Sequence, residues 1–276
     1  ALTAQDFEIA AVMIEKISTT LDLQIQQPQL IAWLDQFPRH ILETHPWLCV
    51  HRAWGNYWSG RRGLEEQWLQ CAERSIPNIY PADTAEFQRI QGHIAVVRAH
   101  TALMDENLPE TQAMAEKALQ LLPEGDKKRS EAAIALAAVH WAHGELEKTE
   151  QCFQMAVDSA LMSNYTSMAV GCSGYLAIQQ IKGGRMQEAI NTLQEGLHIA
   201  TPKEDLEMPI AGFLNVHLGD IWRERDDLDL AWHSLELGVR QCQLFGQVDN
   251  LVDAYICMGR HQLAIFDLPN AITSLK

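Results

Sequence analysis

The most constraining feature of this sequence is a pattern that recurs about every 40 residues. An apolar anchor residue stands at six positions: Leu64, Leu108, Leu146, Met186, Leu228 and Leu268. Nine positions before each anchor lies a small residue: Gly55, Ala99, Ala137, Ala177, Gly219 and Gly259. Two antiparallel helices joined by a tight turn approach closely only where a side chain is nearly absent. The pattern therefore indicates stacked helical hairpins, each with an A helix before the anchor and a B helix after it.

Three further offsets follow each anchor. Three positions after it come Gln67, Thr111, Thr149, Ala189, Ala231 and Ala271; seven after it come Cys71, Ala115, Phe153, Leu193, Leu235 and Leu275. Ten positions after it, where the chain continues, come Arg74, Ala118, Ala156, Gly196 and Gly238. These offsets resemble those of the tetratricopeptide repeat, more closely in the last four repeats than in the first two. A period of about 40 instead of 34 predicts helices longer than the standard ones.

The resemblance implies an all-α fold, a right-handed superhelix of about six antiparallel helix pairs. We expect Gly219 and Gly259 to face their own B helices, near Ala231 and Ala271. Residues 46–276 are predicted to form one continuous solenoid domain of repeats. Residues 1–45 are predicted to form an N-terminal helix pair that leads into it, with a first helix over 7–17 and a second that begins at Pro28.

The last repeat is predicted to be truncated. Its B helix has room for only about two turns between Pro269 and Lys276. The sequence also begins at Ala1 without a methionine. We therefore read it as a segment of a longer protein, since a solenoid that ends within a hairpin leaves an apolar face uncapped.

Composition limits the partners and the compartment. The 276 residues include 21 Lys and Arg against 36 Asp and Glu, which gives a net charge of −15. This charge disfavours direct contact with nucleic acid. No apolar run approaches a transmembrane length, and no secretory signal is visible, so we expect a cytoplasmic protein with no membrane contact. The six cysteines form no C-x-x-C pair and are interpreted as reduced packing residues.

A more specific string lies around the first repeat. It consists of Trp33–Leu42, His45–Trp54 and Ser59–Arg61. It resembles the start of the helical-repeat sensor region in the large ATP-dependent LuxR-family (MalT-type) transcription regulators. In that family a WLDxLP stretch precedes an R/H-P-x-L-C helix, an Ala-Trp pair and a Gly-Arg turn. Here Phe37 replaces the usual leucine, and Arg62-Gly63 lengthens the turn.

This resemblance is specific over about residues 30–75. It implies a sensor domain whose ATPase and DNA-binding parts lie outside this chain. Its partners would be a small-molecule inducer or a regulatory protein, together with the ATPase and DNA-binding domains of the parent chain.

Enzyme motifs are absent from the sequence. There is no G-x-x-x-x-G-K-[ST] loop and no H-E-x-x-H. His140 and His143 lie three apart without a third ligand type nearby, so solvated histidines explain them better than a metal site. We expect no catalytic activity, no cofactor and no metal.

Five of the eight tryptophans lie between Trp33 and Trp68. Such a cluster can stack sugars or bases, or it can fill wide gaps between long helices. Trp54 and Trp58 fall at repeat positions that are normally packed, which favours the second interpretation.

Candidate ligand-binding residues follow from the repeat, because the A helices of tetratricopeptide arrays line the concave surface. The candidates are Arg52, Asn56, His93, His100, Glu131, Trp141, Asp220, Arg223 and Arg260. The combination of a cation, amides, imidazoles, a carboxylate and an indole in the first three repeats suits a polar metabolite or a sugar.

Two classes of function remain open. The first is the sensor domain that the resemblance implies. The alternative is a generic tetratricopeptide scaffold or co-chaperone that binds peptides. Arg52 and Asn56 imitate half of a co-chaperone carboxylate clamp, but His93 with Val97 and Glu131 with Ala135 do not complete it, so the sensor interpretation is preferred.

Overall fold

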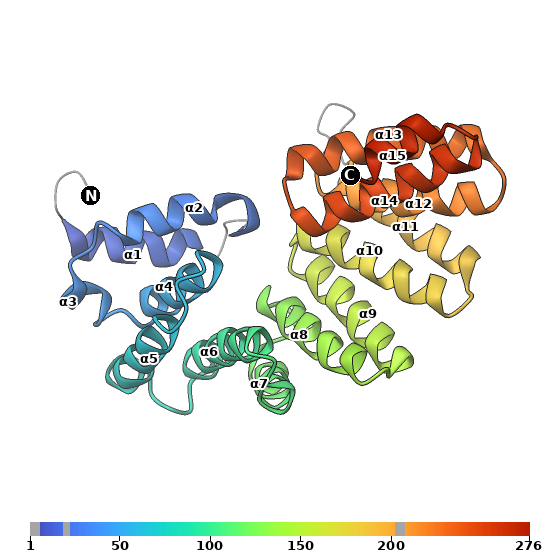
Figure 1. The fold of residues 1–276 in the computed structure, drawn as a ribbon. Coiled ribbons are helices and arrows are strands. Elements are labelled where there is room, and N and C mark those ends of the chain that lie inside the picture. The colour runs from blue at the N-terminus through green and yellow to red at the C-terminus, as the bar shows by residue number, and fades with distance from the viewer. Residues whose placement is uncertain (1–5, 19–22, 202–207) are drawn as a thin grey trace. The chain divides into compact units, whose positions relative to one another are not determined.

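A computed structural model describes residues 6–18, 23–201 and 208–276 of the chain. Within these residues the regular elements are helices, and no strand occurs (Figure 1). In order they are α1 (Phe7–Ser18), α2 (Leu23–Leu34), α3 (Arg39–Leu42), α4 (Pro46–Trp58), α5 (Glu65–Ile79), α6 (Ala85–Met104), α7 (Leu108–Leu121), α8 (Lys128–Ala142), α9 (Leu146–Met162), α10 (Thr166–Lys182), α11 (Met186–Ala200), α12 (Ala211–Glu224), α13 (Leu228–Phe245), α14 (Val248–Ala264) and α15 (Leu268–Ser274). The prediction of an all-α, tetratricopeptide-like fold is confirmed.

The anchor residues mark the turns, as predicted. Helices α7, α9, α11, α13 and α15 each begin at an anchor, and Leu64 is the N-cap residue of α5. Five of the resulting helix pairs pack directly against each other: α4 with α5, α6 with α7, α10 with α11, α12 with α13, and α14 with α15. Each anchor therefore lies directly after its turn, at the start of the B helix.

A left-handed backbone residue makes each of these turns tight. Two positions before the anchor, φ is positive at Glu106 (58°), Gly144 (73°), Gly184 (75°), Asp226 (62°) and Phe266 (62°). The amide that follows donates to a carbonyl five residues back, for example from Asn107 to Ala102 at 2.9 Å. This arrangement is a Schellman motif, which satisfies the last carbonyls of the A helix.

The first hairpin departs from this arrangement. Its longer turn places positive φ at Gly60 (65°) and Gly63 (81°). In the later repeats the sequence indicates a left-handed residue two positions before the anchor only where that residue is glycine, as at Gly144 and Gly184. Glu106, Asp226 and Phe266 adopt the same conformation although L side chains there cost about 1–2 kcal/mol.

Small residues permit close packing of the helices. A Cβ atom on Gly219 would lie 2.7 Å from Leu235 Cγ and 3.1 Å from the carbonyl oxygen of Ala231, so its predicted contact is confirmed. A Cβ atom on Gly259 would meet Leu275 at 2.8 Å, at the end of its own hairpin. Gly55 differs, because the side chain nearest to it is Ile31 of α2 and not a residue of its own B helix.

The closest approach in the C-terminal repeats joins α12 to α13. A Cβ atom on Gly238 would lie 2.9 Å from the backbone nitrogen of Val216 and 3.0 Å from the carbonyl oxygen of Gly212. A Cβ atom on Gly212 would in turn lie 2.7 Å from the backbone nitrogen of Cys242. The two helix backbones therefore touch, and only glycine fits at these crossings.

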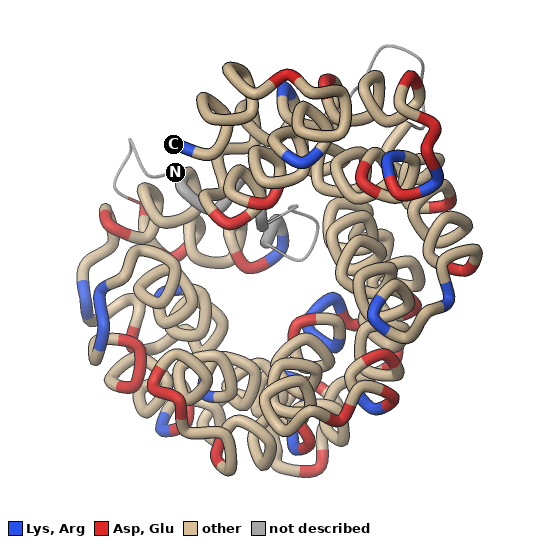
Figure 2. The backbone as a smooth tube through the Cα atoms, turned by 45° about the vertical axis from the view of Figure 1, so that its right-hand side comes forward, with Lys and Arg blue, Asp and Glu red and all other residues tan. Residues whose placement is uncertain are grey.

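The chain divides into two compact parts, an N-terminal half (Ala1–Ala142) and a C-terminal half (His143–Lys276). The division falls between α8 and α9, within the third predicted repeat. Each half has its own buried apolar clusters, which include Trp54 and Ile90 in the first and Leu193 and Leu214 in the second. Acidic residues occur along the helices of both halves, with basic residues between them (Figure 2). A single continuous domain over 46–276 stays a prediction.

One detail near the N-terminus differs from the sequence analysis. Helix α2 begins at Leu23, so Pro28 lies inside it and does not start it. The residues before Pro28 are leucine, isoleucine and glutamines, which are compatible with a helix, and their helix propensity outweighs the single hydrogen bond that proline removes.

The six cysteines are free and buried, as the packing interpretation requires.

The contact between α12 and α13 gives a stability prediction. Gly238→Ala should lower the free energy of unfolding by about 1–3 kcal/mol, because its Cβ meets backbone atoms that can move only with their helix. The matched control is Gly171→Ala, also inside a helix, whose Cβ would meet only the end of the Ile210 side chain at 3.1 Å. Urea denaturation should show Gly171→Ala unchanged or more stable. Equal behaviour of the two variants would contradict the close approach.

Candidate functional site

Successive A helices of the N-terminal half share a buried polar and aromatic network. It joins α4, α6 and α8, which are the A helices of the first three repeats and pack side by side. Helix α4 starts with Pro46 at its first turn, a position that costs no hydrogen bond, and most of the side chains that follow are buried. This placement brings Trp47 and Trp54 against ionisable groups of the next two A helices.

The first cluster centres on Asp126, in the turn before α8. Its carboxylate accepts from Arg89 Nε at 2.7 Å, from His93 Nε2 at 3.1 Å and from the backbone amide of Lys128 at 2.9 Å. The edge of the His93 ring meets Trp47, with the ring centroids 4.7 Å apart. The Arg89 guanidinium lies over the same indole at 4.8 Å. A buried carboxylate is thus fully satisfied between α6 and α8.

The second cluster centres on Glu131 of α8. Its backbone carbonyl accepts from His100 Nε2 at 3.0 Å, and its carboxylate lies 3.3 Å from Lys128 Nζ. The Lys128 ammonium sits 3.9 Å from the centroid of the Trp54 ring, a cation–π contact inside the protein. His100 meets Trp54 edge-on with the ring centroids 5.3 Å apart. Charged, imidazole and indole groups of three A helices therefore contact one another.

Burial shifts the pKa values of the ionisable side chains in this network. Burial raises the pKa of the Asp126 carboxyl, but His93, Arg89 and the Lys128 amide outweigh it and hold that pKa well below its usual range. Burial lowers the pKa of His93 and of His100, although Asp126 and Glu131 oppose this. Both rings are thus neutral at pH 7, with the proton on Nε2, because that nitrogen faces an acceptor.

His51 of α4 is a third buried histidine of the cluster. Burial lowers its pKa to about 3, and the neighbouring His93, Lys128 and Arg89 act in the same direction. Its ring stacks on Trp47 with the centroids 6.1 Å apart. The sequence analysis missed His51, Lys128, Asp126 and Arg89. The position of Lys128 one helical turn before Glu131 was the available signal for an ion pair.

Two candidates on α4, Arg52 and Asn56, lie one turn apart. Arg52 forms an ion pair with Asp35, which follows α2. Arg52 Nε and Asn56 Nδ2 are buried, and neither has a hydrogen-bond partner among the described residues. Within the described residues these two donors therefore lack an acceptor.

The structure places the other candidates in two settings. Trp141, near the end of α8, is 58% exposed. Asp220 and Arg223 of α12 pair at 2.8 Å, and Arg260 of α14 reaches the other oxygen of Asp220 at 3.3 Å. The structure thus brings Asp220, Arg223 and Arg260 together as a charge cluster on two A helices of the C-terminal half.

The tryptophans near the first repeat include both buried and exposed side chains. Trp54 is buried, as expected, whereas Trp58 is 51% exposed, so the prediction that it packs between helices is wrong. The longer first turn begins directly after Trp58 and leaves its ring at the end of α4.

Two negative findings concern metals and membranes. Among the described residues, no group of three or more His, Cys, Asp or Glu side chains could hold a metal ion. None of the described helices is both long and apolar enough to cross a membrane.

The buried histidines give a pH prediction. In the unfolded chain His51 has an ordinary pKa of about 6.5, so below that pH the unfolded state binds more protons than the folded state. Stability should therefore fall as the pH falls from 7 to 5, with His51 contributing at most about 1.4 kcal/mol per pH unit. His51→Phe keeps an aromatic ring on Trp47 and should flatten this slope in urea unfolding.

The matched control is His143→Gln, at an exposed position in the other half. It should retain the wild-type slope. A wild-type slope in His51→Phe would show that His51 is not kept neutral by its surroundings.

Solved structures of similar fold include helical-repeat proteins. A Rap protein complexed with Competence and Sporulation Factor is 12% identical, with a TM-score of 0.59, and the match covers 98% of this chain and 85% of that one. The apo form of RapI is 11% identical, with a TM-score of 0.55 over 83% and 94%. BtubC (BKLC) from P. vanneervenii is 16% identical, with a TM-score of 0.54 over 74% and 87%. At these identities the likeness shows the fold alone.

Sequence comparisons are more specific. No curated protein sequence matches the chain. The model of the MalT-like TPR region, where TPR denotes the tetratricopeptide repeat, matches residues 92–276. This match spans about two thirds of the chain and begins after the string around the first repeat. The chain belongs to the family of MalT-like TPR regions.

Proposed function

We propose that this chain is the signal-receiving domain of a cytoplasmic transcription regulator of the LuxR family. In this proposal it binds a small polar inducer or a regulatory protein. It then controls ATPase and DNA-binding parts that lie outside this chain. Membership in the family of MalT-like TPR regions supports the proposal, and so does the regulator-like string Trp33–Trp54.

The observation that carries the proposal is the pair of unsatisfied donors on α4. An unsatisfied buried donor costs about 1–3 kcal/mol, and donors on charged groups cost more. Arg52 Nε and Asn56 Nδ2 both bear this cost in the described structure. A ligand rich in acceptor oxygens, such as a sugar, a carboxylate or a phosphate ester, would satisfy both and recover that free energy.

The polar network offers a route from this site to the rest of the N-terminal half. Trp54 lies between Arg52 and Asn56 in the sequence and contacts both His100 and Lys128. A ligand that shifts α4 would thereby change the surroundings of charged groups on α6 and α8. In this proposal the contacts of His93, His100 and Glu131 change when the ligand binds. The same contacts keep the A helices aligned with one another.

The remaining candidates are proposed as further ligand contacts, each within its own half of the chain. Trp141 supplies an exposed indole on which an apolar sugar face can stack. Asp220, Arg223 and Arg260 form the corresponding charged cluster in the C-terminal half. The proposed domain is non-catalytic and uses no cofactor. A Rap protein of similar fold, crystallised with Competence and Sporulation Factor, is a precedent for a helical-repeat protein that binds a signalling factor.

Calorimetry of the chain against oligosaccharides, sugar phosphates and dicarboxylates tests the proposal. At least one class should bind, and Arg52→Gln and Asn56→Leu should each weaken binding by about 10-fold or more, since each removes a hydrogen bond to the ligand. Arg39→Gln is the matched control, because Arg39 is exposed and pairs only locally with Glu43.

Binding that survives both substitutions would place the site elsewhere. Binding confined to unrelated peptides would instead favour the alternative, a tetratricopeptide scaffold or co-chaperone.

A further inference from the structure

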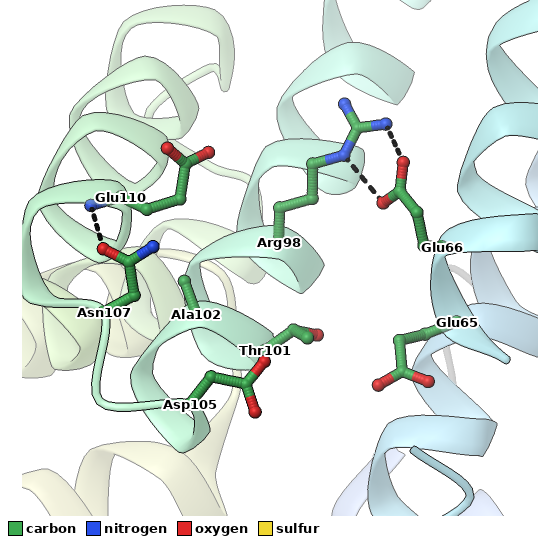
Figure 3. A pocket seen from close by; sticks show the side chains of 8 residues that line it. All are labelled: Glu65, Glu66, Arg98, Thr101, Ala102, Asp105, Asn107 and Glu110. Carbon is green, nitrogen blue, oxygen red and sulfur yellow. Dashed lines mark hydrogen bonds and ion pairs between the residues drawn. The ribbon is translucent and has the colours of Figure 1, made fainter. Parts of the chain in front are cut away.

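A recess lies where the first two repeats meet, on other residues than the polar network. It has a volume of about 350 Å³ and opens between the start of α5, the end of α6 and the start of α7 (Figure 3). Its lining residues are Glu65, Glu66, Arg98, Thr101, Ala102, Asp105, Asn107 and Glu110. We call it the acidic recess, because four carboxylates and one guanidinium line it.

The one cation of the lining is already neutralised. Arg98 forms a two-point ion pair with Glu66, with N–O distances of 2.9 and 3.1 Å. It also contacts Glu73 at 2.7 Å. The positive charge of Arg98 therefore offsets the negative charge of Glu66. The negative charges of Glu65, Asp105 and Glu110 remain in the lining. Arg62, on the exposed first turn, lies 3.5 Å from the Asp105 carboxylate and also donates to the backbone carbonyl of Met104 at 3.4 Å.

Glu65 is the unusual member of the lining. It is 3% exposed, and no hydrogen bond or ion pair to its side chain occurs within the described parts of the chain. Its carboxylate points into the acidic recess, towards the side of Thr101 and Asp105 (Figure 3). Thr101 Oγ1 is also buried without a partner. A buried carboxylate without a counter-charge is costly, so a ligand that supplied one would bind there favourably.

A comparison within the chain shows that repeat geometry alone does not bury this carboxylate. A recess of about 380 Å³ recurs at the equivalent place between the fifth and sixth repeats, and Asp229 lines it at the position of Glu65. Asp229 is exposed. At the position of Thr101 that recess has His261, whose Nδ1 is likewise buried without a partner. The cavity is thus a property of the repeat, whereas the buried, uncompensated carboxylate is particular to the acidic recess.

We propose that the acidic recess binds the ammonium or guanidinium head of an organic cation. Such a head carries only donors, and it would give Glu65 its counter-charge and donate to Thr101 Oγ1. A volume of about 350 Å³ accommodates a small ligand. An organic cation fits better than a metal ion, because no metal-ligating cluster of three side chains occurs among the described residues. This site is independent of the function proposed above.

The cationic head has two possible sources, a free diamine or a Lys or Arg side chain of a partner. Isothermal calorimetry with putrescine, agmatine, and capped lysine and arginine amides separates them. Binding of the diamines identifies a free small cation. Binding of the capped amides alone identifies a side chain. Either result supports the recess as a cation site if Glu65→Gln weakens it by about 10-fold or more, as expected for loss of a charged partner.

The control variant is Asp229→Asn, at the equivalent position of the other recess, which should bind the probe as the wild type does. Thermal unfolding shows whether Glu65→Gln folds. Without probe its Tm should equal or exceed that of the wild type, because an uncompensated carboxylate has been removed. The probe should raise the wild-type Tm and leave that of Glu65→Gln unchanged.

Three results would overturn the proposal. The first is that none of the four probes binds at millimolar concentration. The second is that Glu65→Gln binds the probe as tightly as the wild type. The third is that potassium chloride at the same ionic strength reproduces the Tm shift, which would show only screening of the net charge of −15.

Discussion

The left-handed turn between the helices of each hairpin is the constraint on which the rest of this structure depends. In the five hairpins after the first, one residue with positive φ, placed two positions before the anchor, reverses the chain within a few residues and satisfies the last carbonyls of the A helix. In the hairpins α6–α7, α10–α11, α12–α13 and α14–α15 the B helix then packs back along its A helix. Close approach follows, and with it the need for small residues where backbones touch, as at Gly212 and Gly238. The turn therefore explains the period, the anchors and the glycines together.

Stacking of the hairpins places the A helices of the N-terminal half side by side, and their shared surface is unusually polar. Asp126, Lys128 and Glu131 are buried there with His93 and His100. Buried ion pairs contribute little net stability, because desolvation offsets much of their attraction. Removing one partner is costly, however, so such a network resists changes of register between helices. This property distinguishes α4, α6 and α8 from a purely apolar interface.

The repeat sequence predicted the features that depend on local geometry. Each anchor marks a turn because the period and the small residues act within one hairpin. Features that depend on neighbouring elements were not predictable. Gly55 meets Ile31 of α2 instead of its own B helix, and Trp58 is exposed because the first turn is longer. His93, His100 and Glu131 were correctly placed on successive A helices. Their burial was not foreseen, because it depends on packing between the A helices of neighbouring repeats. The burial of Glu65 likewise arises from a contact between repeats.

The central claim, that a polar network couples the A helices of the N-terminal half, is tested most directly by a double-mutant cycle across α6 and α8. The cycle combines His93→Gln with Asp126→Asn, whose side chains meet at 3.1 Å, and measures the free energy of unfolding in urea at pH 7. Each single variant leaves a buried partner unsatisfied, so the double variant should be less destabilised than the sum of the two. The expected coupling free energy is about 1–3 kcal/mol. Additivity within about 0.5 kcal/mol would contradict the account, because the two groups would then contribute independently.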